Sequence, residues 1–301
     1  FTSDSARIGG RHHWGQHGVT LATYAHVRQH DDADFGSGIH VNSAEEADAF
    51  EARHIEQFSN LALSVGFGHL RGTDTTEVSF DPSTSAVTSE NIDHTNVYLY
   101  GSYWESRHFN LELGYSVDVQ TEGETRTEQS NPKFGLTWEP ADRLQLRAAV
   151  IRGLKRRVLE NQTLEPTSIA GFNQFFDDIN GTKWWLYALA LSAEPRNDLF
   201  VGAEVSHRKL EVPPPIELTT SITPPPWKEN FSRIYLHKTL GRSVVFSAEY
   251  QFEQFERDET ALNPESLAMS RTHRIPIEVR VFSEVGFFGG LRSTFVDQSG
   301  R

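Results

Sequence analysis

The stretch from Phe109 to Val119, FNLELGYSVDV, carries an apolar side chain at every odd position and a polar or small one at every even position. This period of two is typical of a strand with one face in an apolar medium and the other in a polar one. Strands of soluble proteins usually run for about five or six residues. An alternating run of eleven residues instead matches the roughly 9–11 residues with which a tilted strand crosses a bilayer.

Later segments repeat this alternation, namely residues 144–152, 199–207, 244–253 and 274–281. The longest apolar run, Trp184 to Leu191, has eight residues, far fewer than the ~18 of a membrane helix. If the chain crosses a membrane it must therefore be a closed barrel, because an open sheet edge in lipid leaves backbone groups unpaired. We predict an all-β fold, an antiparallel transmembrane β-barrel, with about 14 strands in this chain and roughly 16 or more in the complete protein.

The connections between the predicted strands alternate between short and long. Brief turns are expected at residues 105–108, 140–143, 195–198, 241–243 and 282–285, and long polar connections at 121–130, 157–182, 212–227 and 256–271. This alternation is typical of bacterial outer-membrane barrels, which have tight periplasmic turns and extended outer loops. The sequence thus predicts the outer membrane of a Gram-negative bacterium. Nearer the start we expect a short strand at 35–42, an acidic turn at 43–48 and a polar loop at 72–91.

Composition excludes several classes of function. A net charge of -13 argues against a nucleic-acid partner, and the absence of cysteine excludes disulfides and thiolate metal sites. The sequence has no motif of a hydrolase, a nucleotide-binding loop or a zinc protease, so neither an enzyme nor a cofactor is predicted. His12, His13 and His17 come closest to a metal cluster, yet on a strand His12 faces away from the other two, and no metal centre is expected.

Three segments resemble a known family: QTLEPTSIAGFNQFFDDINGT (Gln162 to Thr182), HRKLEVP (His207 to Pro213) and STFVDQSG (Ser293 to Gly300). From Asn131 to Asp297 the chain resembles the C-terminal barrel of large bacterial outer-membrane proteins. These proteins fuse periplasmic tetratricopeptide repeats to a barrel similar to that of TonB-dependent receptors. The resemblance implies that residues 1–301 form one barrel domain of a longer chain, with repeats before it and roughly two to four strands after it. The final strands of such barrels, a repeat pattern and a receptor-type plug are not found in this sequence.

The predicted lumen face carries charges of both signs: Glu112, Asp118, Arg147, Glu204, Arg208, Glu249, Glu253, Glu278, Arg280 and Arg292. One interpretation is a water-filled path whose charges act on a hydrophilic solute. The other is that these charges pair across neighbouring strands and fill the barrel. The loop 157–182 holds a second candidate set, made of Phe172, Phe175, Phe176, Asp177 and Asp178. It either folds into the mouth and narrows it, contacts a partner, or packs on the barrel rim.

Three hypotheses of function follow. The first is an outer-membrane transport or secretion pore, a porin-like path for a hydrophilic solute or polymer, to which the family resemblance adds exopolysaccharide export. The second is a non-conducting anchor for periplasmic repeats or a surface assembly. The third is the barrel of a TonB-dependent uptake receptor. Expected partners are outer-membrane lipid and lipopolysaccharide, and a periplasmic repeat domain or partner protein.

Overall fold

The computed structural model describes residues 2–35, 39–81, 84–105, 108–156, 163–213, 226–257 and 268–301. Fourteen strands form one antiparallel sheet and follow one another in chain order, and two further strands form a separate hairpin. This confirms the predicted all-β antiparallel fold. Within the described ranges, no helix is long and apolar enough to cross a membrane.

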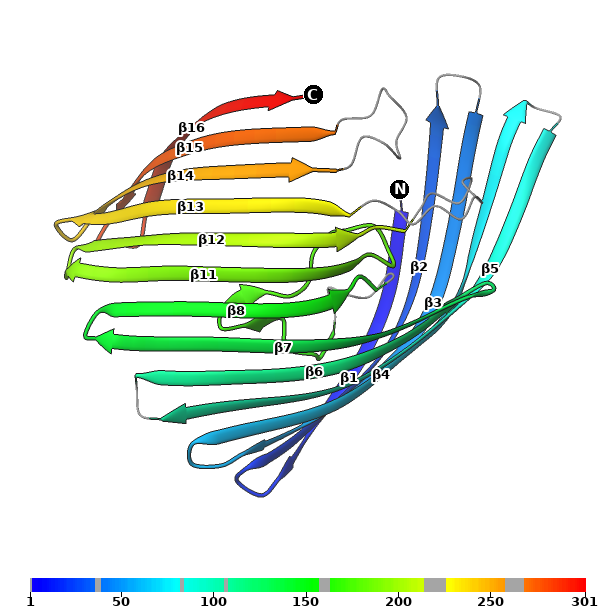
Figure 1. Cartoon of the computed structure of the whole chain (residues 1–301), viewed down its shortest axis with the longest axis horizontal. Coiled ribbons are helices and arrows are strands. Elements are labelled where there is room, and N and C mark those ends of the chain that lie inside the picture. The colour runs from blue at the N-terminus through cyan, green and yellow to red at the C-terminus, as the bar shows by residue number, and fades with distance from the viewer. Residues whose placement is uncertain are drawn as a thin grey trace. The chain divides into compact units, whose positions relative to one another are not determined.

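The strands of the sheet are β1 (Thr2–Trp14), β2 (Gly18–Phe35), β3 (Ile39–Gln57), β4 (Leu61–Asp81), β5 (Thr84–Glu105), β6 (Phe109–Glu122), β7 (Thr125–Ala141), β8 (Leu144–Leu154), β11 (Lys183–Arg196), β12 (Leu199–Glu211), β13 (Trp227–Leu240), β14 (Val244–Glu256), β15 (Met269–Phe282) and β16 (Phe288–Gly300). The hairpin pairs β9 (Ser168–Ile169) with β10 (Phe172–Asn173). Figure 1 shows β11 to β16 side by side in chain order.

The short turns predicted at 140–143, 195–198, 241–243 and 282–285 lie at or next to these positions, while residues 106 and 107 of the turn predicted at 105–108 lie outside the described residues. Strand β13 ends at Leu240 and β14 begins at Val244, and Gly241 between them has a φ of 66°. Glycine adopts this left-handed conformation without the steric cost that a Cβ atom brings. The turn between β7 and β8 places the non-glycine Arg143 in the same region, with a φ of 66°. Tight turns of this kind keep neighbouring strands in a fixed register.

Three connections predicted as turns or loops are wrong. Residues 43–48 belong to β3, residues 72–91 lie almost wholly in β4 and β5, and residues 121–130 hold only a tight turn at Gly123 between β6 and β7. These segments are polar on both faces, so they lack the alternation that reveals a half-buried strand. Cross-strand pairs such as Arg28 with Glu46 (3.0 Å) hold the β2–β3 extension together instead.

The chain divides into two compact units. We call residues 1–103, 113–132 and 156–167 the N-terminal unit, and residues 104–112, 133–155 and 168–301 the C-terminal unit. The N-terminal unit holds β1 to β4 and most of β5 and β6. The C-terminal unit holds β8 to β16 and the second half of β7.

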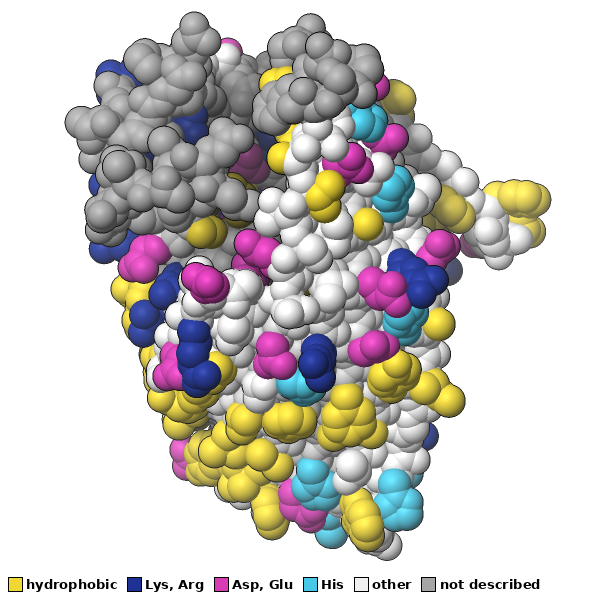
Figure 2. Space-filling model, turned by 90° about the vertical axis from the view of Figure 1, so that its right-hand side faces the viewer, with side chains coloured by type: hydrophobic (Ala, Val, Ile, Leu, Met, Phe, Trp, Pro, Cys, Tyr) yellow, Lys and Arg dark blue, Asp and Glu magenta, His cyan; other side chains and the backbone are white. Residues whose placement is uncertain are grey.

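Each unit has an apolar face and a polar face. In β11, for example, Tyr187, Leu189 and Leu191 are exposed while Ala188 and Ala190 between them are buried. Large apolar side chains exposed in a continuous array are rare on soluble proteins and typical of a sheet that faces lipid. In Figure 2 hydrophobic side chains gather in a band across the lower half of the view, with acidic, basic and histidine side chains above this band and acidic and histidine side chains below it.

Candidate functional site

The polar face of the N-terminal unit is centred on the carboxylate of Asp118 in β6. The period-two pattern of the strand turns this side chain away from the apolar face, and it is only 1% exposed. A buried carboxylate is stable only when hydrogen bonds and positive charge compensate for the lost water. Asp118 accepts hydrogen bonds from Asn96 (3.0 Å) and Asn131 (2.5 Å), and His94 Nε2 lies 2.9 Å from its Oδ1.

The segment that follows β8 completes this network. Arg156 Nε donates to Asp118 at 3.0 Å, and its Nη2 forms an ion pair with Glu165, which also accepts a hydrogen bond from the Tyr100 hydroxyl. Burial disfavours the charged guanidinium, but the carboxylates of Asp118 and Glu165 outweigh it and raise the pKa of Arg156 above its ordinary value. Arg156 therefore stays charged and bridges two buried carboxylates.

A second anchor holds the same segment to β3. The carboxylate of Glu51 accepts hydrogen bonds from the Thr163 hydroxyl (2.8 Å) and from the backbone N–H groups of Leu164 (2.7 Å) and Glu165 (3.0 Å). Arg53 donates from Nη1 to the Leu164 carbonyl at 2.9 Å. Backbone groups that would otherwise be buried without partners are thus satisfied by side chains of the sheet. Residues 163–165 are fixed on the polar face.

The β9–β10 hairpin lies on the polar face of the C-terminal unit (Figure 1). Ile169 and Phe172 are buried, at 1% and 4% exposure. The backbone N–H of Ala170 donates to Glu112 (3.1 Å), and Arg147 donates to the Ala170 carbonyl (3.2 Å) with its guanidinium 5.0 Å from the Phe172 ring centroid. The predicted loop residue Phe172 and the predicted lumen residues Glu112 and Arg147 therefore meet in one cluster.

Arg208 of β12 forms a second contact between the loop and the sheet. Its guanidinium makes ion pairs with Asp178 of the loop and Glu229 of β13, and it lies 3.7 Å from the centroid of the Phe176 ring. Phe176 in turn packs edge-on against Trp184, with centroids 5.2 Å apart. The same guanidinium thus takes part in ion pairs and in a cation–π contact. A cation–π contact is strongest when the cation is desolvated.

All of the remaining predicted lumen residues except Arg292 form ion pairs along the polar face of the C-terminal unit. Arg233 lies 3.5 Å from Glu204 and 3.6 Å from Glu249, and Arg147 lies 3.8 Å from Glu204. The other predicted positions are Glu253, which pairs with Arg274 at 2.9 Å, Glu278, which pairs with Arg280 on its own strand, and Arg292, which is exposed and opposite Glu278 in the register. Of the predicted loop residues, Phe175 is half-buried and Asp177 is exposed.

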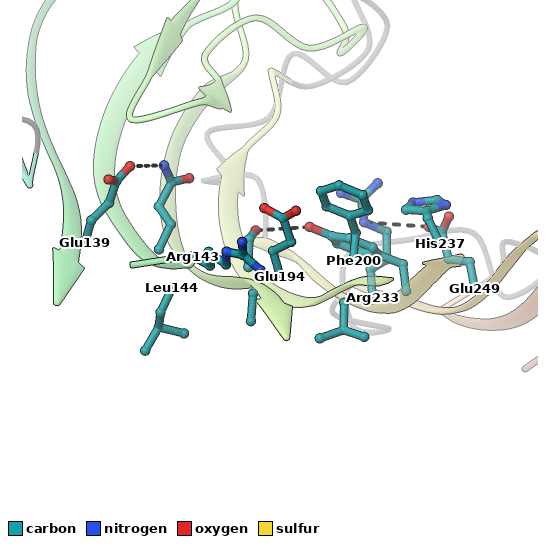
Figure 3. A pocket seen from close by; sticks show the side chains of 13 residues that line it. Glu139, Arg143, Leu144, Glu194, Phe200, Arg233, His237 and Glu249 are labelled. Atoms are coloured by element: carbon teal, nitrogen blue, oxygen red, sulfur yellow. Dashed lines mark hydrogen bonds and ion pairs between the residues drawn. The ribbon is translucent and has the colours of Figure 1, made fainter. Parts of the chain in front are cut away.

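Two hollows open on this polar face. One of about 620 Å³ lies at the short-turn end, where Arg233 faces Glu249 and the Gln145 amide donates to Glu139 at 3.1 Å (Figure 3). The second, about 580 Å³, lies beside the β9–β10 hairpin and is lined by Phe172, Arg208 and other side chains of the sheet. Each volume falls within the roughly 300–1,000 Å³ of ordinary ligand pockets.

Sequence reasoning missed the residues that tie the loop to the N-terminal unit. Glu51 lies in a strand that is polar on both faces, so its direction was not visible, and Glu165 was hidden in a long polar loop. The alternation of β5 and β7 turns the side chains of Asn96 and Asn131 to the polar face, so the sequence pattern could have revealed these two residues. Of the three histidines considered as metal ligands, His12 packs edge-on against Trp14, with ring centroids 4.4 Å apart. The described ranges contain no group of three or more His, Asp or Glu side chains placed to hold a metal ion.

Comparison with solved structures identifies the fold. No protein-family model and no curated protein matches the chain. The ferric yersiniabactin uptake receptor FyuA from Yersinia pestis is similar in structure, with a TM-score of 0.62 at 12% identity over 98% of this chain and 53% of that one. Also similar is the alcaligin receptor FauA from Bordetella pertussis, with a TM-score of 0.56 at 13% identity over 99% of this chain and 60% of that one. The copper transporter OprC has a TM-score of 0.61 at 9% identity over 98% of this chain and 56% of that one.

The fold is therefore that of the β-barrel of TonB-dependent outer-membrane receptors and transporters. At these identities the likeness shows the fold alone, and the chain spans about half of the length of FyuA. The localisation predicted from the loop lengths, the outer membrane of a Gram-negative bacterium, agrees with this fold. The predicted linkage to tetratricopeptide repeats finds no support in these comparisons.

Proposed function

We propose that this chain forms part of the wall of an outer-membrane transport barrel, and that its polar face lines the path of a hydrophilic solute. The segment 163–179 is the element that narrows this path. The observation that carries the proposal is the burial of this segment on the polar face, with Glu165 at 2% and Ile169 at 1% exposure. A loop held this firmly by ion pairs occupies space that a free outer loop would leave open.

Two features favour transport over a non-conducting anchor. The polar face of the C-terminal unit keeps hollows of about 620 and 580 Å³ despite its ion pairs. Two of the similar structures are also named as an uptake receptor, for ferric yersiniabactin in FyuA, and as a transporter, for copper in OprC. Receptor-type uptake is therefore the preferred direction. Exopolysaccharide export rests on the sequence resemblance and stays a prediction.

Conductance of the full-length protein in planar bilayers tests this function. We expect Arg156→Ala to release the segment 163–165 and to raise the conductance above that of the wild type, because Asp118 and Glu165 lose the cation between them. Arg126→Ala is the matched control, since Arg126 is exposed and pairs only with its neighbour Glu128 in the described structure. Retention of the heat-resistant band on gels verifies that each variant folds.

Cross-linking gives the converse test, because the chain has no cysteine of its own. A short thiol cross-linker between Glu51→Cys and Thr163→Cys, whose wild-type side chains lie 2.8 Å apart, ties the segment down in the Arg156→Ala background. We expect the cross-link to restore the wild-type conductance and a reducible linker to release it again. A folded protein that conducts in none of these forms is an anchor. Equal conductance in all of them means that the segment does not narrow the path.

A further inference from the structure

The hollow beside the β9–β10 hairpin, about 580 Å³ in volume, has aromatic rings on two sides. Phe172 and Phe176 come from the loop, and Phe231 of β13 and Phe255 of β14 come from the sheet. The strand register places Phe231 on the polar face, directly opposite Ser206 of β12. We call this hollow the aromatic slot.

The two rings of the sheet stand on a wall that is otherwise polar. Phe231 and Phe255 are only half-buried, although a polar side chain at either position would leave less apolar area in water. Apolar surface that is rimmed by polar side chains is typical of a binding groove. The aromatic slot therefore fits a ligand that has flat apolar faces.

Each charged side chain that the structure describes on the wall of the slot belongs to an ion pair. These pairs are Arg208 with Asp178 and Glu229, Arg233 with Glu204, and Glu253 with Arg274. A charged ligand would have to displace one member of such a pair, and a charge left unpaired in a partly buried site is costly. The pairing thus favours a ligand without net charge.

The same carboxylates retain hydrogen-bonding capacity for a neutral ligand. A carboxylate offers about four lone-pair sites. Glu229 accepts a hydrogen bond from Arg208, and Glu253 accepts one from Arg274 at 2.9 Å. The ion pair of Glu204 with Arg233 is longer, at 3.5 Å. Hydroxyl groups can donate to the remaining lone pairs without breaking any of these pairs.

A further aromatic ring continues this face toward the short turns. Tyr235 is four residues beyond Phe231 on β13, about 13 Å along the strand, and it lines the hollow of about 620 Å³. Arg233 lines both hollows, and its guanidinium carbon lies 5.1 Å from the centroid of the Tyr235 ring. Figure 3 shows Arg233 paired with Glu249 at this boundary. Two aromatic sites in succession fit a ligand built of repeated units.

We propose that the aromatic slot binds a neutral saccharide chain. A sugar ring has apolar C–H faces and hydroxyl groups at its edge, so its faces lie against the phenylalanines and its hydroxyl groups donate to Glu229 and Glu253. The next units of the chain pass Arg233 and reach Tyr235. This inference rests on the proposed function, since it assigns a class of solute to the path along the polar face.

Titration calorimetry of the full-length protein, in a detergent without a sugar head group, tests this assignment. The probes are short neutral oligosaccharides of glucose, galactose and mannose, with acidic galacturonate and basic glucosamine oligomers of matched length. We expect a neutral series to bind most tightly. The monosaccharide of that series is expected to bind more weakly than the oligomer, because it cannot contact Phe231 and Tyr235 at once.

Substitution of Phe231 tests the aromatic contact. We expect Phe231→Ala to raise the Kd of the neutral oligomer roughly tenfold, because the apolar contact of the ring is lost. Phe231→Tyr keeps the ring and should bind nearly as the wild type does. Phe252→Ala is the matched control, since the Phe252 ring lies on the apolar face, 5.0 Å from the His273 ring. The heat-resistant band on gels verifies folding.

A change of charge provides a readout that a merely structural role would not move. Arg233→Gln leaves Glu204 and Glu249 without this cation. We expect the variant to bind the basic glucosamine oligomer several-fold more tightly than the wild type does. Unchanged binding of this oligomer would contradict the role given to the ion pairs.

The saccharide assignment is refuted if no neutral series binds, if a charged series binds the wild type more tightly than every neutral one, or if Phe231→Ala binds as the wild type does. Conductance of the same preparations keeps the two proposals apart. Conductance without saccharide binding refutes the assignment and leaves the transport function standing. Saccharide binding that depends on Phe231, in a protein that never conducts, supports the slot and refutes transport.

Discussion

Glycines on the polar face lie beneath aromatic rings of the residues paired with them on the next strand. The pairs are Gly66 with Tyr98, Gly153 with Trp184 and Gly202 with Tyr235. In each pair the aromatic ring covers the backbone where a side chain would otherwise stand, so the glycine contributes space rather than flexibility. Such covered glycines keep large rings flat against the sheet.

We therefore expect Gly202→Ala to destabilise the protein. The added Cβ would lie 2.3 Å from Cζ of Tyr235, and displacement of the ring should cost about 1–3 kcal/mol. Gly289→Ala in β16 is the control, because nothing lies within 4 Å of its Cβ position. Thermal unfolding in detergent measures both variants. Equal melting temperatures would contradict the ring contact.

His40 gives the β2–β3 hairpin a dependence on pH. Its Nδ1 lies 2.8 Å from Asp34 and its Nε2 lies 3.1 Å from Asp32. The hydrogen bond to Asp34, followed by the charge of Asp32, raises the pKa of His40 above its ordinary 6.5. The stabilisation is therefore complete below pH 6.5 and is lost as the pH rises through the elevated pKa of the folded state.

Hydrogen exchange of the β2–β3 tip across pH 5 to 9 measures this effect. We expect slower exchange on the acid side, and His40→Gln should remove the pH dependence without an equal loss of protection at high pH. A wild-type tip whose protection does not change through this range would show that the His40 contacts are not formed in solution.

At the scale of the strands, the two faces have different roles. The apolar positions of β6 that the sequence predicted, such as Leu113 and Tyr115, are about half exposed, while Asp118 is buried among polar partners. The same alternation holds in β11 and β15, so the directions of these side chains were predictable from period alone. What the period could not reveal is the partner of each polar side chain, because partners come from a loop distant in sequence.

Leu113→Arg tests whether the apolar face lies in lipid. Near the bilayer midplane an arginine at such a position should destabilise the barrel by about 2–4 kcal/mol. Val87→Arg is the control, because Val87 is also exposed (62%) but lies in the polar extension of β5. Unfolding by urea in lipid vesicles measures both. A cost at Leu113 no larger than that at Val87 would mean that this face is in water.

At the scale of the whole molecule, the fourteen-stranded sheet and its short turns followed from the sequence, whereas the outer parts of β3, β4 and β5 did not. The difference is physical. A strand that touches lipid must alternate, but a strand pair that extends beyond it satisfies its backbone by pairing and is free to be polar on both faces. The loop 157–182 shows the same limit, since Glu165 is a buried ion-pair partner that no local pattern distinguishes from a solvated acid.

The extended β4–β5 hairpin constrains how this part of the protein can change length during evolution. Its register runs without interruption from Leu61 opposite Tyr103 to Ser79 opposite Ser85. Deletion of one residue from one strand shifts every partner beyond the gap, and it also turns the shifted residues to the other face. Removal of one residue from each strand at paired positions keeps β4 and β5 in register, but β4 also pairs with β3, from His40 opposite Ser79, and β3 pairs with β2. Homologous chains should therefore change the lengths of these four strand extensions together.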